Sequence, residues 1–201
     1  MIKKTSLFIG FLLFISAFLF SMPVFSKIVG IPLGSEVPDF KLLDLEGKPH
    51  QFSELKGKVV MIHFWSATCP YVIRYNDRLN KITSDYAPKG VMILGINSNV
   101  NETAGQTAQT REARHITYPI WMDSGNEVAD LFGAVTTPHV FIIDEKGTLV
   151  YRGALDDQGW SKDNPVTKNY ANEVLDAVLS GKQLPYTDTK TAGCTVKRKK
   201  G

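Results

Sequence analysis

The chain contains only two cysteines, Cys69 and Cys194, and thiols are the side chains best able to exchange disulfides or reduce peroxides. Cys69 follows an apolar run that ends at Trp65 and directly precedes Pro70. This pattern predicts that Cys69 lies where a buried strand gives way to a helix, since proline fits the first helical turn. The free N–H groups and the dipole of a helix start favour a thiolate, which makes Cys69 a candidate nucleophile. The alternative is a buried, inert cysteine, which is common among free cysteines.

Cys194 lies in the polar, turn-rich segment that begins near Gly181. If this segment folds back, Cys194 could resolve an intermediate that forms at Cys69. The alternative is a structural disulfide, which would contribute roughly 4 to 5 kcal/mol in the loop-entropy model. We favour the redox pair, because a cysteine at a helix start is a poor choice for a purely structural bond. The basic end, Lys197 to Lys200, is expected to be a solvated tail.

Thr137, Pro138 and His139 form a second group of candidates, at the start of another apolar run. The proline can mark an ordinary turn, because most bonds that precede proline are trans. His139 is either a proton shuttle near Cys69 or a strand residue that faces the other side of a sheet. Side chains alternate along a strand, so the register decides between these roles, and the sequence leaves both open.

The composition indicates one globular domain of ordinary size. The chain has 201 residues, of which 43% are hydrophobic and 21% charged, so it has too much apolar content for a disordered chain. Two cysteines are too few for a disulfide scaffold. The net charge of +3 includes Lys3 and Lys4, and without them the body is almost neutral. This balance gives no electrostatic reason to expect a nucleic-acid partner.

The N-terminal residues are typical of an export signal. Lys3 and Lys4 precede an uncharged run from residue 5 to 26, with small residues before Lys27. Residues 1–26 are therefore predicted to be a signal peptide, and the alternative is an uncleaved anchor that would span the membrane. The expected location is the periplasm, or the inner membrane with the domain facing the periplasm. Membrane contact is expected only through residues 1–26, if they are not removed.

The remaining elements predict an α/β fold in which a central mixed sheet is flanked by helices. A hairpin over 39–52 precedes the sheet as an N-terminal extension. Buried strands are expected at 58–65, 91–97 and 118–122, and a second hairpin at 139–153. Helical patterns cover 71–86, 103–115, 126–132 and 169–179. The order of elements puts helices on both faces of the sheet, with one domain over 34–182 and a polar tail over 183–201 that carries Cys194.

Three motifs resemble the thioredoxin-fold redoxins, of the alkyl-hydroperoxide-reductase/thiol-specific-antioxidant type. They are the run 64–70 (FWSATCP), the run 136–144 (TTPHVFIID) and the ending 193–197 (GCTVK). The resemblance implies a thioredoxin-like fold, with the Thr137–Pro138 bond cis and opposite Cys69. It also implies that Cys69 is the catalytic cysteine, with a substrate groove formed by Trp65, Pro70, Thr137, Pro138 and His139.

The chain departs from this pattern in two respects. Val72 stands where thioredoxins carry their second cysteine, so Cys194 is the only cysteine that could resolve a disulfide on Cys69. Peroxiredoxins also use a hydroxyl, a proline and a distant arginine. Ser66 can supply the hydroxyl, but Ile62 and Pro138 stand where the proline and the arginine would be. Arg74 and Arg78 could substitute for that arginine, or they form a solvated helix face.

The expected function is therefore that of an exported thiol-disulfide oxidoreductase. The alternatives are a thiol-dependent peroxidase and a non-catalytic binding module whose two cysteines form a structural disulfide. The expected partners are thiols or disulfides of exported proteins, or hydroperoxides, together with a membrane-bound or small-thiol reductant. No cofactor is expected, and no metal, because Cys69 and His139 alone would make a poor site. Trp160 lies in a polar insertion and could contact a partner, although such residues more often cap a loop.

Overall fold

The computed structural model describes residues 30–199. The predicted signal or anchor, residues 1–26, lies outside the described residues. Between residues 30 and 199, no helix is both long and apolar enough to cross a membrane.

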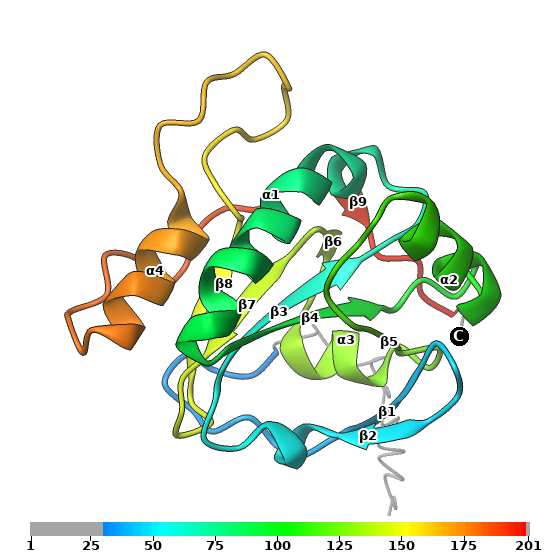
Figure 1. The fold of residues 1–201 in the computed structure, drawn as a ribbon, viewed down its shortest axis with the longest axis horizontal. Coiled ribbons are helices and arrows are strands. Elements are labelled where there is room, and N and C mark those ends of the chain that lie inside the picture. Colours follow the sequence, from blue (N-terminus) through cyan, green and yellow to red (C-terminus); the bar gives the residue numbers. More distant parts are fainter. Residues whose placement is uncertain (1–29, 200–201) are drawn as a thin grey trace, which may run out of the picture.

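The centre of the fold is a seven-stranded mixed sheet with the strand order β2-β1-β5-β4-β3-β7-β8 (Figure 1). The central strands β3 (Val59–Trp65) and β4 (Val91–Asn97) are parallel, and β5 (Ile120–Met122) is parallel to β4. Strand β7 pairs antiparallel with both β3 and β8, and the N-terminal hairpin of β1 and β2 joins the sheet through β5. The bounds of these outer strands are Lys41–Asp44 (β1), Pro49–Gln51 (β2), Val140–Ile143 (β7) and Leu149–Gly153 (β8).

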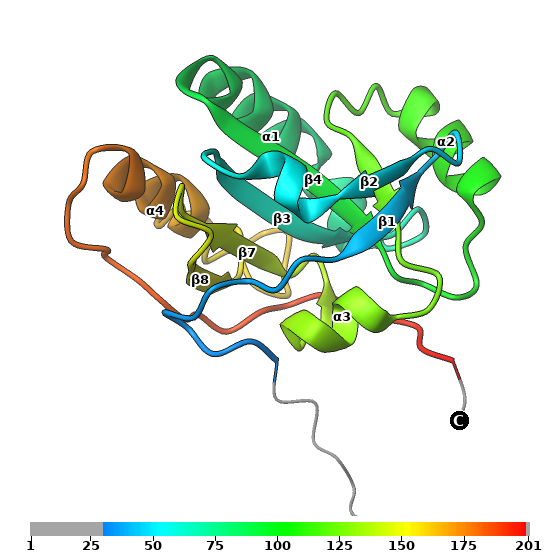
Figure 2. The same cartoon turned by 90° about the horizontal axis from the view of Figure 1, so that it is seen from below.

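Helices cover both faces of the sheet, as the sequence predicts (Figure 2). Strand β3 supplies side chains alternately to two cores, because successive residues of a strand point to opposite faces. Met61 and Trp65 pack with α1 (Pro70–Tyr86) and α4 (Tyr170–Leu179), whereas Ile62 and Phe64 pack with α3 (Glu127–Phe132). The remaining helices are η1 (Phe52–Leu55), η2 (Ala87–Lys89) and α2 (Ala104–Ala113).

Helix α1 begins directly after Cys69, which is its N-cap residue. Pro70 occupies the first turn, where its missing N–H costs nothing. The helix buries one face, at the positions that its apolar spacing predicts: Val72, Tyr75, Leu79, Ile82 and Tyr86. This face packs on the sheet and fixes the direction in which the helix start points. Cys69 therefore lies at the junction of β3 and α1, as its sequence position predicts.

The C-terminal segment differs from the solvated tail that its polarity suggests. Its residues 187–189 bond to Arg152 of β8, and β9 (Cys194–Thr195) then pairs antiparallel with β6 (Thr136–Thr137). The Val196 side chain is 3% exposed and belongs to the core on the α3 face. Beyond it, the Lys197 amide donates to Asn99 Oδ1 at 2.9 Å and the Lys199 amide to Asn126 Oδ1 at 3.0 Å. Backbone pairing, apolar packing and the ion pairs Arg152–Asp188 and Arg198–Asp130 thus attach this polar segment to the domain.

His63 is a fully buried histidine in β3, and its ring lies 4.9 Å from that of Tyr118. Neither ring nitrogen has a hydrogen-bond partner, and burial lowers the pKa of His63 to about 3. The unfolded chain therefore binds a proton at His63 below pH 6.5 that the folded chain excludes. We expect the free energy of unfolding to fall from pH 6.5 towards pH 3, with His63 contributing up to about 1.4 kcal/mol per pH unit.

The matching test is urea unfolding of the wild type and of His63→Leu across this pH range. The variant should show a shallower loss of stability with acid. His115→Asn is the control, because His115 is exposed and asparagine tolerates its positive φ of 51°. An equal slope for His63→Leu and the wild type would contradict the assignment.

Candidate active site

The Cys69 thiol lies at the start of α1 and donates a hydrogen bond to the Thr137 carbonyl oxygen at 3.0 Å. The Thr137–Pro138 bond is cis, as the family resemblance implies. Cys69 itself is only 2% exposed, whereas its neighbours Thr68 and Pro70 are exposed. The Cys69 side chain is therefore covered, whereas the residues on either side of it in the chain are open to solvent.

Cys194 lies beside Cys69, although the two residues are far apart in the sequence. Both cysteines are free thiols. In the β6–β9 ladder, Cys194 is the direct partner of Thr137, the same residue whose carbonyl accepts from Cys69. Burial and the adjacent Cys69 sulfur raise the pKa of Cys194 to about 11, while Lys197 and the Tyr71 amide oppose this rise. Cys194 thus keeps its proton at neutral pH and can donate a hydrogen bond to a thiolate on Cys69.

Gly193 allows the tail to approach this closely. A Cβ on this residue would lie 2.3 Å from the Thr137 oxygen and 2.8 Å from its carbonyl carbon. Both atoms belong to the backbone that holds Cys69, so neither can move aside easily. Only glycine therefore brings the β9 backbone against the residue before Pro138.

Glu102 organises the segment that leads into Cys69, and sequence reasoning missed it. The carboxylate of Glu102 is 8% exposed and accepts five hydrogen bonds. Their donors are Ser66 Oγ (2.7 Å), the amides of Ala67 (2.8 Å) and Thr68 (3.2 Å), Thr68 Oγ1 (2.7 Å) and Asn97 Nδ2 (2.9 Å). Burial alone would raise the pKa of Glu102, but these donors hold the pKa below its usual 4.5. No local motif marks this glutamate, because its partners come from other parts of the chain.

The five predicted groove residues do not share one open surface. Pro70 is exposed, but Trp65 is fully buried under the site, and Thr137 and Pro138 are also buried. His139 is 7% exposed, and its ring lies 4.4 Å from Phe141 in the core on the α3 face. Cys69 belongs to the core on the other face, so the register favours the strand role of His139 over the shuttle role. Burial, the main cause, and nearby Arg152 lower the pKa of His139 to about 4, so the ring is neutral at neutral pH.

The residues that a peroxidase would need are engaged elsewhere. The Ser66 hydroxyl donates to Glu102 at 2.7 Å. Arg78 is paired with Asp156, and Arg74 donates to the Gly159 oxygen at 2.7 Å. Hydrogen bonds and ion pairs thus direct both arginines towards the 156–159 loop.

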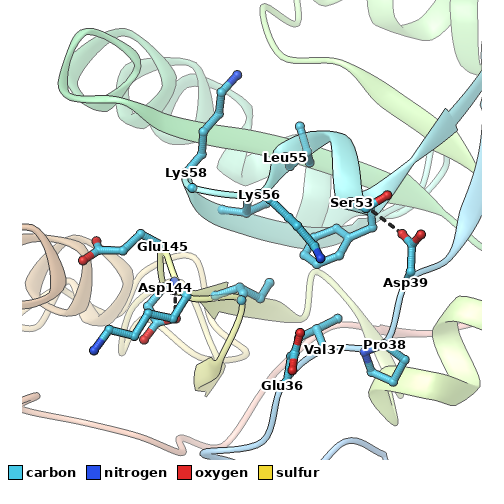
Figure 3. A pocket seen from close by; sticks show the side chains of 16 residues that line it. Glu36, Val37, Pro38, Asp39, Ser53, Leu55, Lys56, Lys58, Asp144 and Glu145 are labelled. Carbon is cyan, nitrogen blue, oxygen red and sulfur yellow. Dashed lines mark hydrogen bonds between the residues drawn. The ribbon is translucent and has the colours of Figure 1, made fainter.

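A separate cavity of about 430 Å³ lies at the opposite end of β3 from Cys69 (Figure 3). It is bordered by Lys58, where β3 begins, and by the turn 144–147. On its wall the Ser53 amide donates to Asp39 Oδ1 at 2.8 Å. A strand of seven residues spans roughly 20 Å, so this cavity takes no part in chemistry at Cys69.

Comparison with known proteins identifies the family of this chain. The model of the AhpC/TSA family matches residues 33–152, which is more than half of the chain. The chain belongs to the AhpC/TSA family. The thiol-disulfide oxidoreductase ResA of Geobacillus thermodenitrificans is 32% identical over 125 residues, which cover 62% of this chain and 71% of that protein. ResA of Halalkalibacterium halodurans is also 32% identical, over 127 residues and with the same coverage.

Solved structures agree with this assignment. A hypothetical protein of Sinorhizobium meliloti 1021 is 31% identical, with a TM-score of 0.78 over 86% of this chain and 97% of that one. An uncharacterized protein of Geobacillus kaustophilus is also 31% identical, with a TM-score of 0.79 over 85% and 94%. A putative thiol:disulfide interchange protein DsbE of Chlorobium tepidum, 19% identical with a TM-score of 0.59 over 76% and 98%, shares the fold. The thioredoxin-like fold is thus confirmed, and with the ResA relatives the chain is a redox enzyme of the thiol-disulfide oxidoreductase type.

Proposed function

We propose that this enzyme exchanges disulfides with exported proteins, with Cys69 as the nucleophile and Cys194 as the resolving cysteine. The observation that best supports this proposal is that both cysteines contact Thr137. Its carbonyl oxygen accepts a hydrogen bond from Cys69, and its backbone pairs with that of Cys194. The relatives named ResA support a protein disulfide as the substrate. The export signal predicted for residues 1–26 supports a periplasmic location, with a membrane-bound or small-thiol reductant to restore the two thiols.

The reaction proceeds in two exchanges. The Cys69 thiolate attacks one sulfur of the substrate disulfide, so a Cys69–substrate bond forms while the substrate S–S bond breaks, and the leaving thiolate takes up a proton. The Cys194 sulfur, once deprotonated, then attacks Cys69, which forms the Cys69–Cys194 disulfide and releases the second substrate thiol. The enzyme gives up two electrons and two protons, and the substrate disulfide becomes two thiols.

The surroundings of the two sulfurs support these different roles. Cys69 is the N-cap residue of α1, and the N-terminal end of a helix favours a nearby negative charge through its dipole. Cys194 has the raised pKa, so it holds the proton until Cys69 has been consumed. Once Cys69 is in a mixed disulfide its sulfur can carry no charge, so the contribution of Cys69 to the raised pKa of Cys194 is lost and only burial still raises it. The resolving sulfur therefore becomes easier to ionise at the step that needs it.

A redox titration tests this assignment. We expect the Cys69–Cys194 disulfide to form and open reversibly in glutathione or dithiothreitol buffers, at a potential above about −300 mV. Mass spectrometry after alkylation of free thiols measures the oxidised fraction. A bond that stays closed well below −300 mV would make the pair structural, and a bond that never forms would remove Cys194 from the mechanism.

A further inference from the structure

The tail already occupies the backbone edge beside Pro138. Thr136 and Thr137 pair with Thr195 and Cys194, so an incoming chain cannot add a strand there while β9 is in place. The exposed residue that directly follows Cys69 is Pro70, and the surface beyond it is open to a substrate polypeptide. A role of this surface in substrate binding rests on the proposed function.

An open groove of about 380 Å³ follows directly from Pro70. It is lined by Pro70, Tyr71, Ile73, Arg74, Trp160 and Lys162, and we call it the Trp160 groove. Ile73 is 42% exposed and Trp160 is 60% exposed, an unusual degree for side chains of this size. The Tyr71 and Trp160 rings meet edge to face, with their centroids 5.6 Å apart. The groove thus lies between the first turn of α1 and a loop that is distant from it in the sequence.

The loop that carries Trp160 has a defined internal structure. Figure 1 shows it in yellow to orange, beside the N-terminal end of α1. The side-chain Nε2 of Gln158 donates to the backbone oxygens of Lys162 and Asn164, and the side-chain Nδ2 of Asn164 donates to the backbone oxygen of Gln158. Arg74 fastens the loop to α1 through Gly159 at 2.7 Å. The loop therefore holds Trp160 in an exposed position, which differs from a tryptophan that caps its own loop.

The charged side chains that line the groove are all positive. Its lining includes two cations, Arg74 and Lys162, and no carboxylate. Neither cation forms an ion pair with any residue of the described range 30–199. The Arg74 guanidinium lies 5.0 Å from the centre of the Tyr71 ring, and its Nε is buried with no hydrogen-bond partner. An acidic group in the groove would therefore meet two cations that have no counter-charge.

We propose that the Trp160 groove binds the part of the substrate polypeptide next to its reacting cysteine, and that it selects a large apolar side chain with an acidic neighbour. The apolar side chain packs on Trp160 and Ile73, and the carboxylate lies near Arg74 and Lys162. Aromatic residues and arginine are the side chains that most often dominate the energetics of such contacts. Because the groove begins at Pro70, a chain bound in it has its cysteine close to Cys69.

Synthetic peptides of equal length test this proposal with the full enzyme. Each carries one cysteine in a mixed disulfide with 2-mercaptoethanol, flanked by Asp-Phe, Lys-Phe or Asp-Ser. We expect kcat/KM of the wild type to be about tenfold higher for the Asp-Phe peptide than for the other two, through a lower KM. Lys162→Glu should reverse the preference for aspartate over lysine, and Trp160→Ala should reduce the preference for phenylalanine over serine.

Matched controls are Lys182→Glu, an equivalent charge reversal beyond α4, and Leu43→Ala, which removes an exposed apolar side chain of β1. Both should keep the wild-type preferences. Equal kcat/KM values for the three peptides, or preferences that survive both groove variants, would overturn the proposed role of the groove in substrate binding. The proposal of disulfide exchange would still stand. A wild type that reduces neither the peptides nor 2-hydroxyethyl disulfide would overturn the proposed function as well.

Discussion

Replacing Cys194 by serine is expected to stop the enzyme after its first exchange, with the substrate attached to Cys69. The serine hydroxyl cannot attack the mixed disulfide, and Val72 offers no local substitute. With pre-reduced enzyme freed of excess thiol, a stoichiometric covalent adduct should accumulate, visible by non-reducing electrophoresis and by mass. Cys69→Ser should form no adduct and should lower turnover by at least about 10³-fold, since the nucleophile itself is lost.

The matched control for the trapping experiment is Thr195→Ala, an exposed neighbour of Cys194 in the same strand. It keeps the β6–β9 ladder and should turn over like the wild type. Turnover of Cys194→Ser at the wild-type rate would show that Cys194 does not resolve the intermediate. An adduct that maps to Cys194 in the wild type, in place of Cys69, would exchange the two roles.

Replacing Glu102 by alanine is expected to lower the free energy of unfolding by about 3 to 5 kcal/mol, because it leaves five donors around a buried site without their acceptor. Two of these donors are the amides of Ala67 and Thr68, which directly precede Cys69. For a protein of this size the loss corresponds to a Tm decrease of about 10 °C. Thermal unfolding followed by circular dichroism measures it.

The effect of Glu102 should depend on pH in a defined direction. Its folded pKa is held below the unfolded value of 4.5, so its stabilisation is complete above pH 4.5 and is lost as the pH falls through the folded pKa. The difference in stability between the wild type and Glu102→Ala should therefore narrow in acid. Glu112→Ala, an exposed glutamate of α2, is the control and should change stability by less than about 0.5 kcal/mol. Equal stabilities of Glu102→Ala and Glu112→Ala would contradict the assigned role of Glu102.

The main elements of the fold could be predicted from the sequence because their signals are local. The apolar run 58–65 and the helical spacing of 71–86 correspond to β3 and α1 within a residue or two. Pro70 marks the start of α1, and Gly90, with a φ of 85°, ends the short helix η2 that follows α1. Chemistry at Cys69 was predicted from the same local pattern, because a cysteine between a buried strand and a proline has few other placements.

Composition does not predict features of the structure that depend on contacts between distant segments. The basic end, Lys197 to Lys200, is expected from its charge to be solvated. The backbone amides of Lys197 and Lys199 nevertheless donate to Asn99 and Asn126. The sequence around the tail lysines, and around the two asparagines, contains no pattern that predicts these hydrogen bonds. For the same reason the sequence does not predict the role of Glu102, because this role depends on the five hydrogen-bond donors that surround its carboxylate.

Local sequence patterns identify Cys69 as a candidate nucleophile at a helix start and Cys194 as a distant cysteine that could serve it. Only the tertiary structure decided that Cys194 lies beside Cys69, because this depends on the ladder with Thr137 and on the space that Gly193 leaves free. It also decided on which side of the sheet His139 lies, directly before β7, since one residue of register moves a side chain to the other side of a sheet. Local patterns fix which groups can react, whereas long-range packing fixes which of them meet.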